Sequence, residues 1–227
     1  IRFILTAGCR CRDITVVCTD MTVYQPLVNL VFHRLHIPVY QSGTEDILQK
    51  SVIATVLMAL DAALSGFDQK SVLRYLRSAL SPVDPDTCDR IENYAIIWGI
   101  RGQKWAQSWE NHPDGLSGVW TEEDQHRLEE LNTARELAIA PLTRLWQGFR
   151  DASDLRGQIL ALYGFLEDIS LEMRLSRMAQ ELDAAGDNRA AQILNQLWEI
   201  LLGALEQMYD MLGDTHWEGE QFIRLFR

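Results

Sequence analysis

Long hydrophobic runs are missing from this chain of 227 residues. The richest apolar stretch, residues 51–64, is interrupted by Asp61 and falls short of the roughly 18–20 residues that a membrane-spanning helix needs. No export signal is recognisable either, because no cleavage site follows the first residues. We therefore expect a protein of the cytoplasm without a membrane partner.

The motifs of common catalytic and nucleotide-binding sites are also missing. The sequence contains no G-x-x-x-x-G-K-[ST] phosphate-binding loop, so no cradle for a nucleoside triphosphate lies within these residues. It has no H-E-x-x-H, no G-x-S-x-G and no glycine pattern of a dinucleotide-binding fold. The sequence thus predicts no catalytic residue.

Metal-binding patterns are sparse. The spacing Cys9-x-Cys11 does not match a zinc knuckle, and no second Cys or His pair follows at a suitable distance. His33 and His36 lie three apart on a predicted helix, but no third ligand accompanies them in register. We expect partly exposed histidines at a helix end, no metal site, and reduced structural thiols at Cys9, Cys11, Cys18 and Cys88.

Negative charge is unevenly distributed along the chain. The 32 acidic and 21 basic residues give a net charge of −11. Residues 1–120 hold 12 acidic and 11 basic residues, whereas residues 121–227 hold 20 and 10, so the two parts carry −1 and −10. Because an acidic surface repels the phosphate backbone, any face that contacts DNA is expected in the first half.

The beginning of the chain predicts one short α/β unit, residues 12–41. Residues 12–19 form a β-branched apolar run typical of a buried strand. Residues 26–35 predict a helix, and residues 37–40 predict a second strand in which Pro38 favours an edge position. Two parallel strands alone cannot cover both faces of a sheet. We infer a piece of a larger protein, whose missing strands come from elsewhere.

Helices are predicted almost everywhere after this unit, in a compact bundle without a sustained heptad. Asp68 and Asp84 are expected to begin helices, and Thr121 to Asp124 resembles a capping box. Pro141 predicts a kink or a restart, and Asp154 opens a helix that reaches about Asp183. We divide the chain into a partial α/β segment at 1–45 and two helical halves at 46–120 and 121–227.

The densest cluster of cations and aromatic residues lies at residues 93–105. Gly99 and Gly102 imply a sharp helix ending, from which Arg101 and Lys104 project among tryptophans. Cations beside aromatic rings suit contact with single-stranded nucleic acid. The candidate DNA-binding residues are therefore Arg101, Lys104 and, as a stacking partner, Trp105.

A structural explanation of the same cluster stays open. Tryptophans at helical spacing are more often core residues than ligand-binding residues. In that interpretation Trp98 and Trp105 anchor the core, and Arg101 satisfies carbonyl groups at the end of the helix.

Several motifs, in order along essentially the whole chain, resemble one family. Arg-Asp-Ile-Thr-Val-Val at 12–17 and His-Ile-Pro-Val-Tyr at 36–40 are similar to strands in the second RecA-like domain of UvrD-like helicases. Three further stretches resemble the AddB family, one of the two subunits of bacterial ATP-dependent helicase/nucleases. They are residues 93–105, Ile-Ala-Pro-Leu at 139–142, and the region from Ala184 to Asp214.

The resemblance implies a fold and a function. The expected fold is mainly α, with a helical bundle insertion of the 2B type attached to a truncated RecA-like strand–helix–strand unit. The parent enzyme would process double-strand DNA ends for recombinational repair, with ATP, magnesium and an iron–sulfur cluster as cofactors. Its partners would be DNA and an A subunit that carries the motor. None of the family's catalytic motifs lies in this chain, so we expect no cofactor within it.

These observations favour a non-catalytic module that contacts DNA or the A subunit. The alternative is a pure protein–protein scaffold, whose acidic half docks the motor subunit without contacting DNA.

Overall fold

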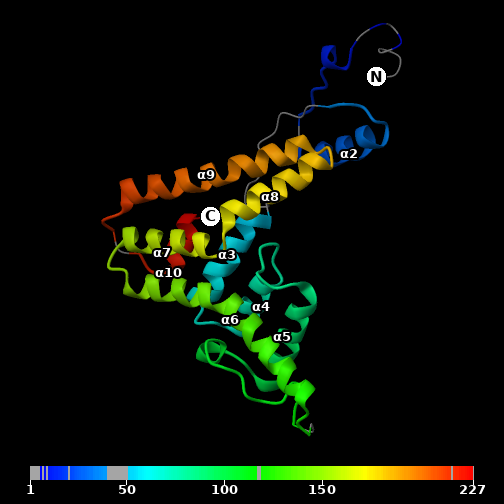
Figure 1. Ribbon diagram of the computed structural model, residues 1–227. Helices are drawn as coiled ribbons and strands as arrows, with labels where there is room; N and C mark the ends of the chain where they lie inside the picture. The colour runs from blue at the N-terminus through cyan, green and yellow to red at the C-terminus, as the bar shows by residue number, and fades with distance from the viewer. Residues whose placement is uncertain are drawn as a thin grey trace. The chain divides into compact units, whose positions relative to one another are not determined.

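The computed structural model divides the chain into two compact units, Ile1–Ile47 and Leu48–Arg227. Helices dominate, and no strand occurs among the described residues (Figure 1). The prediction of a mainly helical protein is therefore confirmed. No described helix is both long and apolar enough to cross a membrane. The residues described are 6, 8, 10–19, 21–39, 51–116, 119–215 and 217–226.

Among its described residues, the first unit contains a short 3-10 turn, η1 (Cys11–Asp13), and the helix α2 (Met21–Arg34). The helix covers most of the segment predicted as helical. Residues 14–18 and 37–39 have no regular secondary structure, so the structure does not show the two expected strands in the part of this unit that it describes. Strands are stabilised by hydrogen bonds to neighbouring strands, and the described part of this unit supplies none.

The second unit is a bundle of eight α-helices among its described residues. They are α3 (Ser51–Leu64), α4 (Gln69–Leu76), α5 (Pro85–Trp98), α6 (Glu122–Asp151), α7 (Leu155–Asp168), α8 (Leu171–Ala184), α9 (Asn188–Leu212) and α10 (Gly219–Phe226). Within it, α6 packs against α3 and α7, while α8 and α9 form a helical hairpin (Figure 1).

Helix starts follow the predicted capping residues. Asp68, Asp84 and Asp154 each accept a hydrogen bond from a backbone N–H in the first turn of their helix. Thr121 and Asp124 bond reciprocally in the expected capping box. Because side-chain oxygens at these positions satisfy N–H groups that lack a partner within the helix, these helix starts are fixed by local sequence.

Of two further helix predictions, one holds for only one of its two alternatives and the other needs correction. Pro141 does not restart a helix, because α6 runs without interruption from Glu122 to Asp151, although its axis changes direction along its length (Figure 1). The single helix expected from 154 to 183 is wrong. It breaks at Ile169 and Ser170, where Ser170 takes a left-handed conformation with φ of 51°.

One hydrophobic core joins the helices of the second unit. Its largest fully buried side chains come from six helices, the α4–α5 connection and the turn after α5. Phe222 of α10 packs edge-on against Phe149 of α6, with ring centroids 4.9 Å apart, so the end of the chain closes the bundle. The largest fully buried side chains of this core include Tyr75, Tyr94, Trp105, Leu142, Phe165 and Phe222.

Candidate nucleic-acid interface

The turn after α5 carries the candidate DNA-binding residues. Gly99 ends the helix in a left-handed conformation (φ 57°, ψ 48°), which glycine adopts without steric cost. Gly102 also has a φ of 57° and begins the 3-10 turn η3 (Gly102–Trp105). Its N–H donates to the carbonyl of Phe67 at 3.0 Å. The sharp helix ending predicted from the two glycines is confirmed, and the turn is held against the α3–α4 connection.

Trp105 lies in the core. Its side chain is 0% exposed, so it cannot stack on a base in this conformation. The prediction that Trp105 is a stacking partner therefore needs correction for this conformation. The alternative interpretation, in which Trp105 anchors the core, fits its position. The ring of Trp109 packs beside Trp105, with centroids 5.9 Å apart, and stacks on Tyr94 at 4.5 Å. Burial raises the pKa of Tyr94.

Hydrogen bonds from α6 fix this turn from the other side. The side-chain amide of Asn132 accepts from the N–H of Trp109 and donates to its carbonyl, both at 2.8 Å. Arg135 donates to the carbonyl of Trp105 at 3.0 Å. Burial lowers the pKa of Arg135, but an arginine stays charged. The indole N–H of Trp109 donates to the carbonyl of Lys104 at 3.2 Å, so the backbone under the candidate cations is rigidly held.

Arg101 and Lys104 themselves are exposed. Neither forms an ion pair with any carboxylate among the described residues, whereas Arg77, Arg90 and Arg127 each do. The structure therefore keeps both of these cations free for an external anion, on a backbone that does not need to be ordered first.

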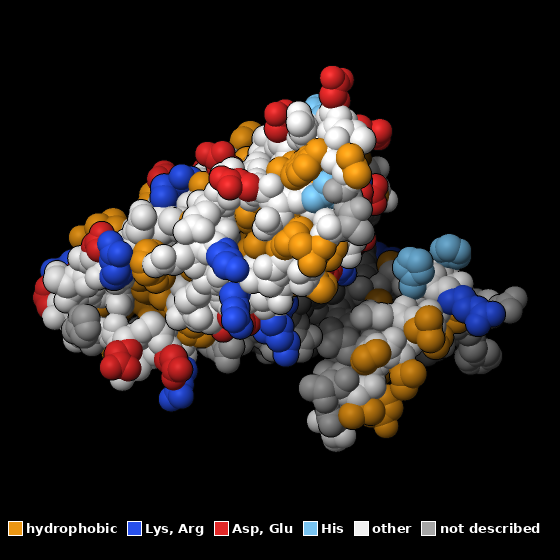
Figure 2. All heavy atoms as spheres, turned by 90° about the horizontal axis from the view of Figure 1, so that it is seen from below, with side chains coloured by type: hydrophobic (Ala, Val, Ile, Leu, Met, Phe, Trp, Pro, Cys, Tyr) orange, Lys and Arg blue, Asp and Glu red, His pale blue; other side chains and the backbone are white. Residues whose placement is uncertain are grey.

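Sequence reasoning missed a third cation, Lys70. It lies in the first turn of α4, is exposed, and also pairs with no described carboxylate. Its neighbour Gln69 donates to the carbonyl of Ala95 at 2.8 Å, which brings the start of α4 to the end of α5. No local pattern signals this, because the two segments meet only in the fold. Figure 2 shows Lys and Arg side chains gathered beside hydrophobic ones on the lower face of the larger unit.

A network of charges closes the connection between η3 and α6. His112, Asp114 and Asp124 bring ligand atoms within 4.8 Å of one another. Arg127 lies among them and bonds to both carboxylates, with 2.6 Å between its Nη2 and Asp114 Oδ2. Hydrogen bonds from Thr121 and from Arg127 hold the pKa of Asp124 well below its usual range.

These three residues do not fit a metal ion. The guanidinium of Arg127 already neutralises both carboxylates. The Nδ1 atom of His112 accepts from the N–H of Asp114 at 3.0 Å, so the hydrogen of a neutral ring is on Nε2, the atom nearest Asp124, which then cannot ligate a metal. The network is therefore a structural anchor for the loop.

The other candidate ligands are not brought together. His33 and His36 are exposed, and no third His, Cys or carboxylate joins them among the described residues. Cys88 is buried, and burial raises the pKa of its thiol, which makes it unreactive. Cys11 and Cys18 are half-buried, and Cys9 lies outside the described residues.

Comparison with known proteins identifies relatives over nearly the whole chain, although no family model matches it. The chain is 31% identical over 238 residues to the B subunit of the ATP-dependent helicase/deoxyribonuclease of Geobacillus kaustophilus, covering 99% of this chain and 20% of that protein. The protein of the same name from Geobacillus thermodenitrificans is 32% identical over 226 residues, with 94% and 19% covered. That of Clostridium botulinum is 25% identical over 229 residues, with 100% and 20% covered. The chain thus spans about a fifth of the length of these relatives.

Proposed function

Because the chain is a homologue of one segment of the AddB proteins, the B subunits of ATP-dependent helicase/deoxyribonucleases, we propose that it is a non-catalytic module that contacts DNA in such an enzyme. The relatives are named for an activity on DNA. The residues of this chain hold no phosphate-binding loop, so ATP and metal ions would bind elsewhere in the whole protein, which would process double-strand ends together with an A subunit.

The observation that carries this proposal is the pair of free cations on a fixed turn. Arg101 and Lys104 are exposed and lack described carboxylate partners, while the backbone at Gly102 bonds to the α3–α4 connection and that at Trp105 bonds to α6. Cations that are held in place lose little freedom when they bind a phosphate, which favours binding. We assign both to the phosphate backbone of a single strand.

Fluorescence anisotropy with a labelled single-stranded oligonucleotide tests this assignment. We expect the double variant Arg101→Ala/Lys104→Ala to bind more weakly, and the slope of log K against log salt to become shallower by about 1.4 if two phosphate contacts are lost. Measurements at about 50 and 200 mM salt give the required range.

The matched control removes the same charge elsewhere. Arg177 of α8 and Arg224 of α10 are exposed, and Arg177→Ala/Arg224→Ala should keep the parental salt slope. If the two double variants show the same affinity and the same salt slope, binding depends only on the net charge of the chain, and the assignment of Arg101 and Lys104 is wrong.

We propose further that the first unit completes a RecA-like sheet with strands outside this sequence. Val16 and Val17 lie on a segment without regular structure and are exposed, as are Leu27 and Leu30 of α2. Apolar β-branched residues of this kind suit a strand that is covered on both faces. Within the complete protein, the amides of residues 14–18 should be protected from hydrogen exchange, and rapid exchange there would contradict the proposal.

A second candidate function is that the acidic half docks the A subunit without DNA contact. The charge of −10 carried by residues 121–227 favours a basic partner surface. Binding to the purified A subunit should then weaken with salt, and binding that is absent or insensitive to salt would contradict this candidate.

A further inference from the structure

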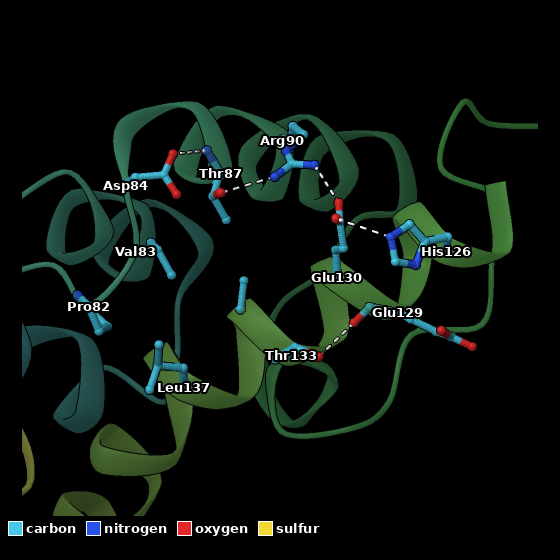
Figure 3. A pocket seen from close by; sticks show the side chains of 11 residues that line it. Pro82, Val83, Asp84, Thr87, Arg90, His126, Glu129, Glu130, Thr133 and Leu137 are labelled. Atoms are coloured by element: carbon cyan, nitrogen blue, oxygen red, sulfur yellow. Dashed lines mark hydrogen bonds and ion pairs between the residues drawn. The ribbon is translucent and has the colours of Figure 1, made fainter. Parts of the chain in front are cut away.

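A hollow of about 530 Å³ opens between the start of α5 and the first half of α6 (Figure 3). Its aliphatic walls come from Pro82, Val83, Ala134 and Leu137. Val83 and Ala134 pack against the core, whereas Leu137 is 57% exposed. The hollow is thus an extension of the hydrophobic core that the chain leaves uncovered.

The hollow has a polarity from one end to the other. In Figure 3, Pro82, Val83 and Leu137 lie at one end, and Arg90, Glu130 and His126 lie at the other. Glu130 accepts from Arg90 at 3.0 Å and lies 3.5 Å from Nε2 of His126. A ligand that fits both ends must carry an aliphatic group and a charged group a few bonds apart.

The charges around the hollow favour a cation. Its lining holds three carboxylates, Asp84, Glu129 and Glu130, against the single guanidinium of Arg90, an excess of two negative charges when His126 is neutral. Hydrogen bonds from Thr87 lower the pKa of Asp84, so this carboxylate is ionised. Such a surface repels nucleic acid.

The ion pair between Arg90 and Glu130 is exchangeable. Both side chains are nearly half exposed, and ion pairs at such positions contribute little to stability. Arg90 also donates to the hydroxyl of Thr87 at 3.1 Å, so it keeps a partner when Glu130 turns to an incoming cation. The charged end can accept a ligand without leaving a buried charge unpaired.

We propose that this hollow is a docking site for a basic polypeptide segment, which places an aliphatic side chain beside Leu137 and an arginine beside Glu130. The guanidinium is favoured over an ammonium because it pairs with a carboxylate through two parallel hydrogen bonds. The proposal deepens the second candidate function, since both require a protein partner, but it uses other contacts than the DNA assignment does.

The probe is the blocked peptide acetyl-Arg-Leu-Leu-Arg-amide, titrated into the isotope-labelled full chain and followed by NMR. We expect saturable shifts confined to residues 82–90 and 126–137, with a Kd in the millimolar range, about −4 kcal/mol. Acetyl-Glu-Leu-Leu-Glu-amide lacks the cation and acetyl-Arg-Ser-Ser-Arg-amide lacks the aliphatic group. Each should bind about fivefold more weakly or not at all.

Two variants of the chain test the two ends of the hollow. Leu137→Ser and Glu130→Gln should each weaken binding of the first peptide about fivefold, and both positions are exposed, so the fold should persist. The controls are Leu160→Ser, which changes an equally exposed leucine (58%) on α7, and Glu172→Gln on α8.

Three results would overturn the docking site. They are the absence of saturable shifts, equal binding of the charge-reversed peptide, and equal loss of binding in the control variants. None of them bears on the affinity of Arg101 and Lys104 for single-stranded DNA or on capture of the A subunit, so a failure here is distinguishable from a failure of either function proposed above.

Discussion

At the scale of single residues, two buried tyrosines of the core differ in how their hydroxyl groups are satisfied. The hydroxyl of Tyr94 accepts from the N–H of Asn111 at 3.0 Å and donates to its carbonyl at 3.2 Å. The hydroxyl of Tyr75 has no hydrogen-bond partner among the described residues, and burial raises its pKa. A buried polar group without a partner costs free energy, whereas a bonded one contributes.

Replacement of the two tyrosines should therefore have opposite effects. We expect Tyr75→Phe to leave the free energy of unfolding unchanged or to raise it by up to about 1 kcal/mol. Tyr94→Phe should lower it by about 1 kcal/mol, because the N–H of Asn111 loses its acceptor. Urea unfolding followed by circular dichroism measures both, and a loss in Tyr75→Phe as large as that in Tyr94→Phe would show that the Tyr75 hydroxyl is bonded after all.

Asp124 should make stability depend on pH. Its pKa in the folded chain lies below the ordinary value of 3.8, so the unfolded chain takes up this proton first as the pH falls. Stability is then greatest above this value and declines as the pH falls through 3.8 and below it. Asp124→Asn should be less stable than the parent at neutral pH, with a smaller decline between neutral pH and pH 3, as measured by urea unfolding at each pH.

The control for this change is Asp183→Asn, since Asp183 is an exposed carboxylate on α8 without a described ion pair. It should retain the parental pH dependence. An Asp124→Asn variant with that same dependence would show that the charge network around Arg127 contributes nothing to acid sensitivity.

At the scale of elements, the contact between α6 and α7 depends on a glycine. A Cβ atom added to Gly148 would lie 2.5 Å from the Cβ of Ala161, far inside van der Waals contact. By contrast, a Cβ atom added to Gly164 of α7 would point into open space. The two helices can therefore pack this closely only where one of them lacks a side chain.

Alanine substitution at these two glycines should separate packing from helix propensity. Gly164→Ala should stabilise the chain by up to about 1 kcal/mol, the gain in helix propensity. Gly148→Ala should destabilise it by about 1–3 kcal/mol, because the overlap outweighs that gain. Thermal unfolding measures both, and the double variant Gly148→Ala/Ala161→Gly should recover most of the loss. Destabilisation that the double variant fails to relieve would place its cause elsewhere.

Local sequence predicted those elements whose determinants are local. The starts at Asp68, Asp84 and Thr121 were predictable because each cap involves residues three apart along the chain. The break at Ser170 was not, because no glycine or proline marks it. The expected strands at 12–19 and 37–40 depend on partner strands, which the described part of the first unit does not supply.

The candidate site was predictable only in part. Two glycines around Arg101 indicated the turn, and the turn is there. The burial of Trp105 was not predictable, because it depends on packing against Trp109 and on a hydrogen bond from Arg135 of α6, which lies 30 residues further along the chain. The hollow beside Leu137 is invisible in the sequence for the same reason, since α5 and α6 form it together.

At the scale of the whole molecule, the two proposed contacts require partners of opposite charge. The net charge of −11 disfavours nonspecific attraction to DNA. Contact through Arg101 and Lys104 would then have to be local and sensitive to salt. Because carboxylates line the hollow between α5 and α6, it suits a partner of the opposite charge. A chain with both features would distinguish a nucleic acid from a protein partner by surface charge alone.

The double attachment of the turn after α5 has a mechanical consequence. One bond ties Gly102 to Phe67, and another ties Trp105 to Arg135 of α6. A pull on Arg101 or Lys104 is therefore shared between two anchor points, the α3–α4 connection and α6, and is not absorbed by bending of a loop. In an enzyme that moves along its substrate, such a turn would act as a stiff coupling, passing the load on a held strand into the body of the bundle.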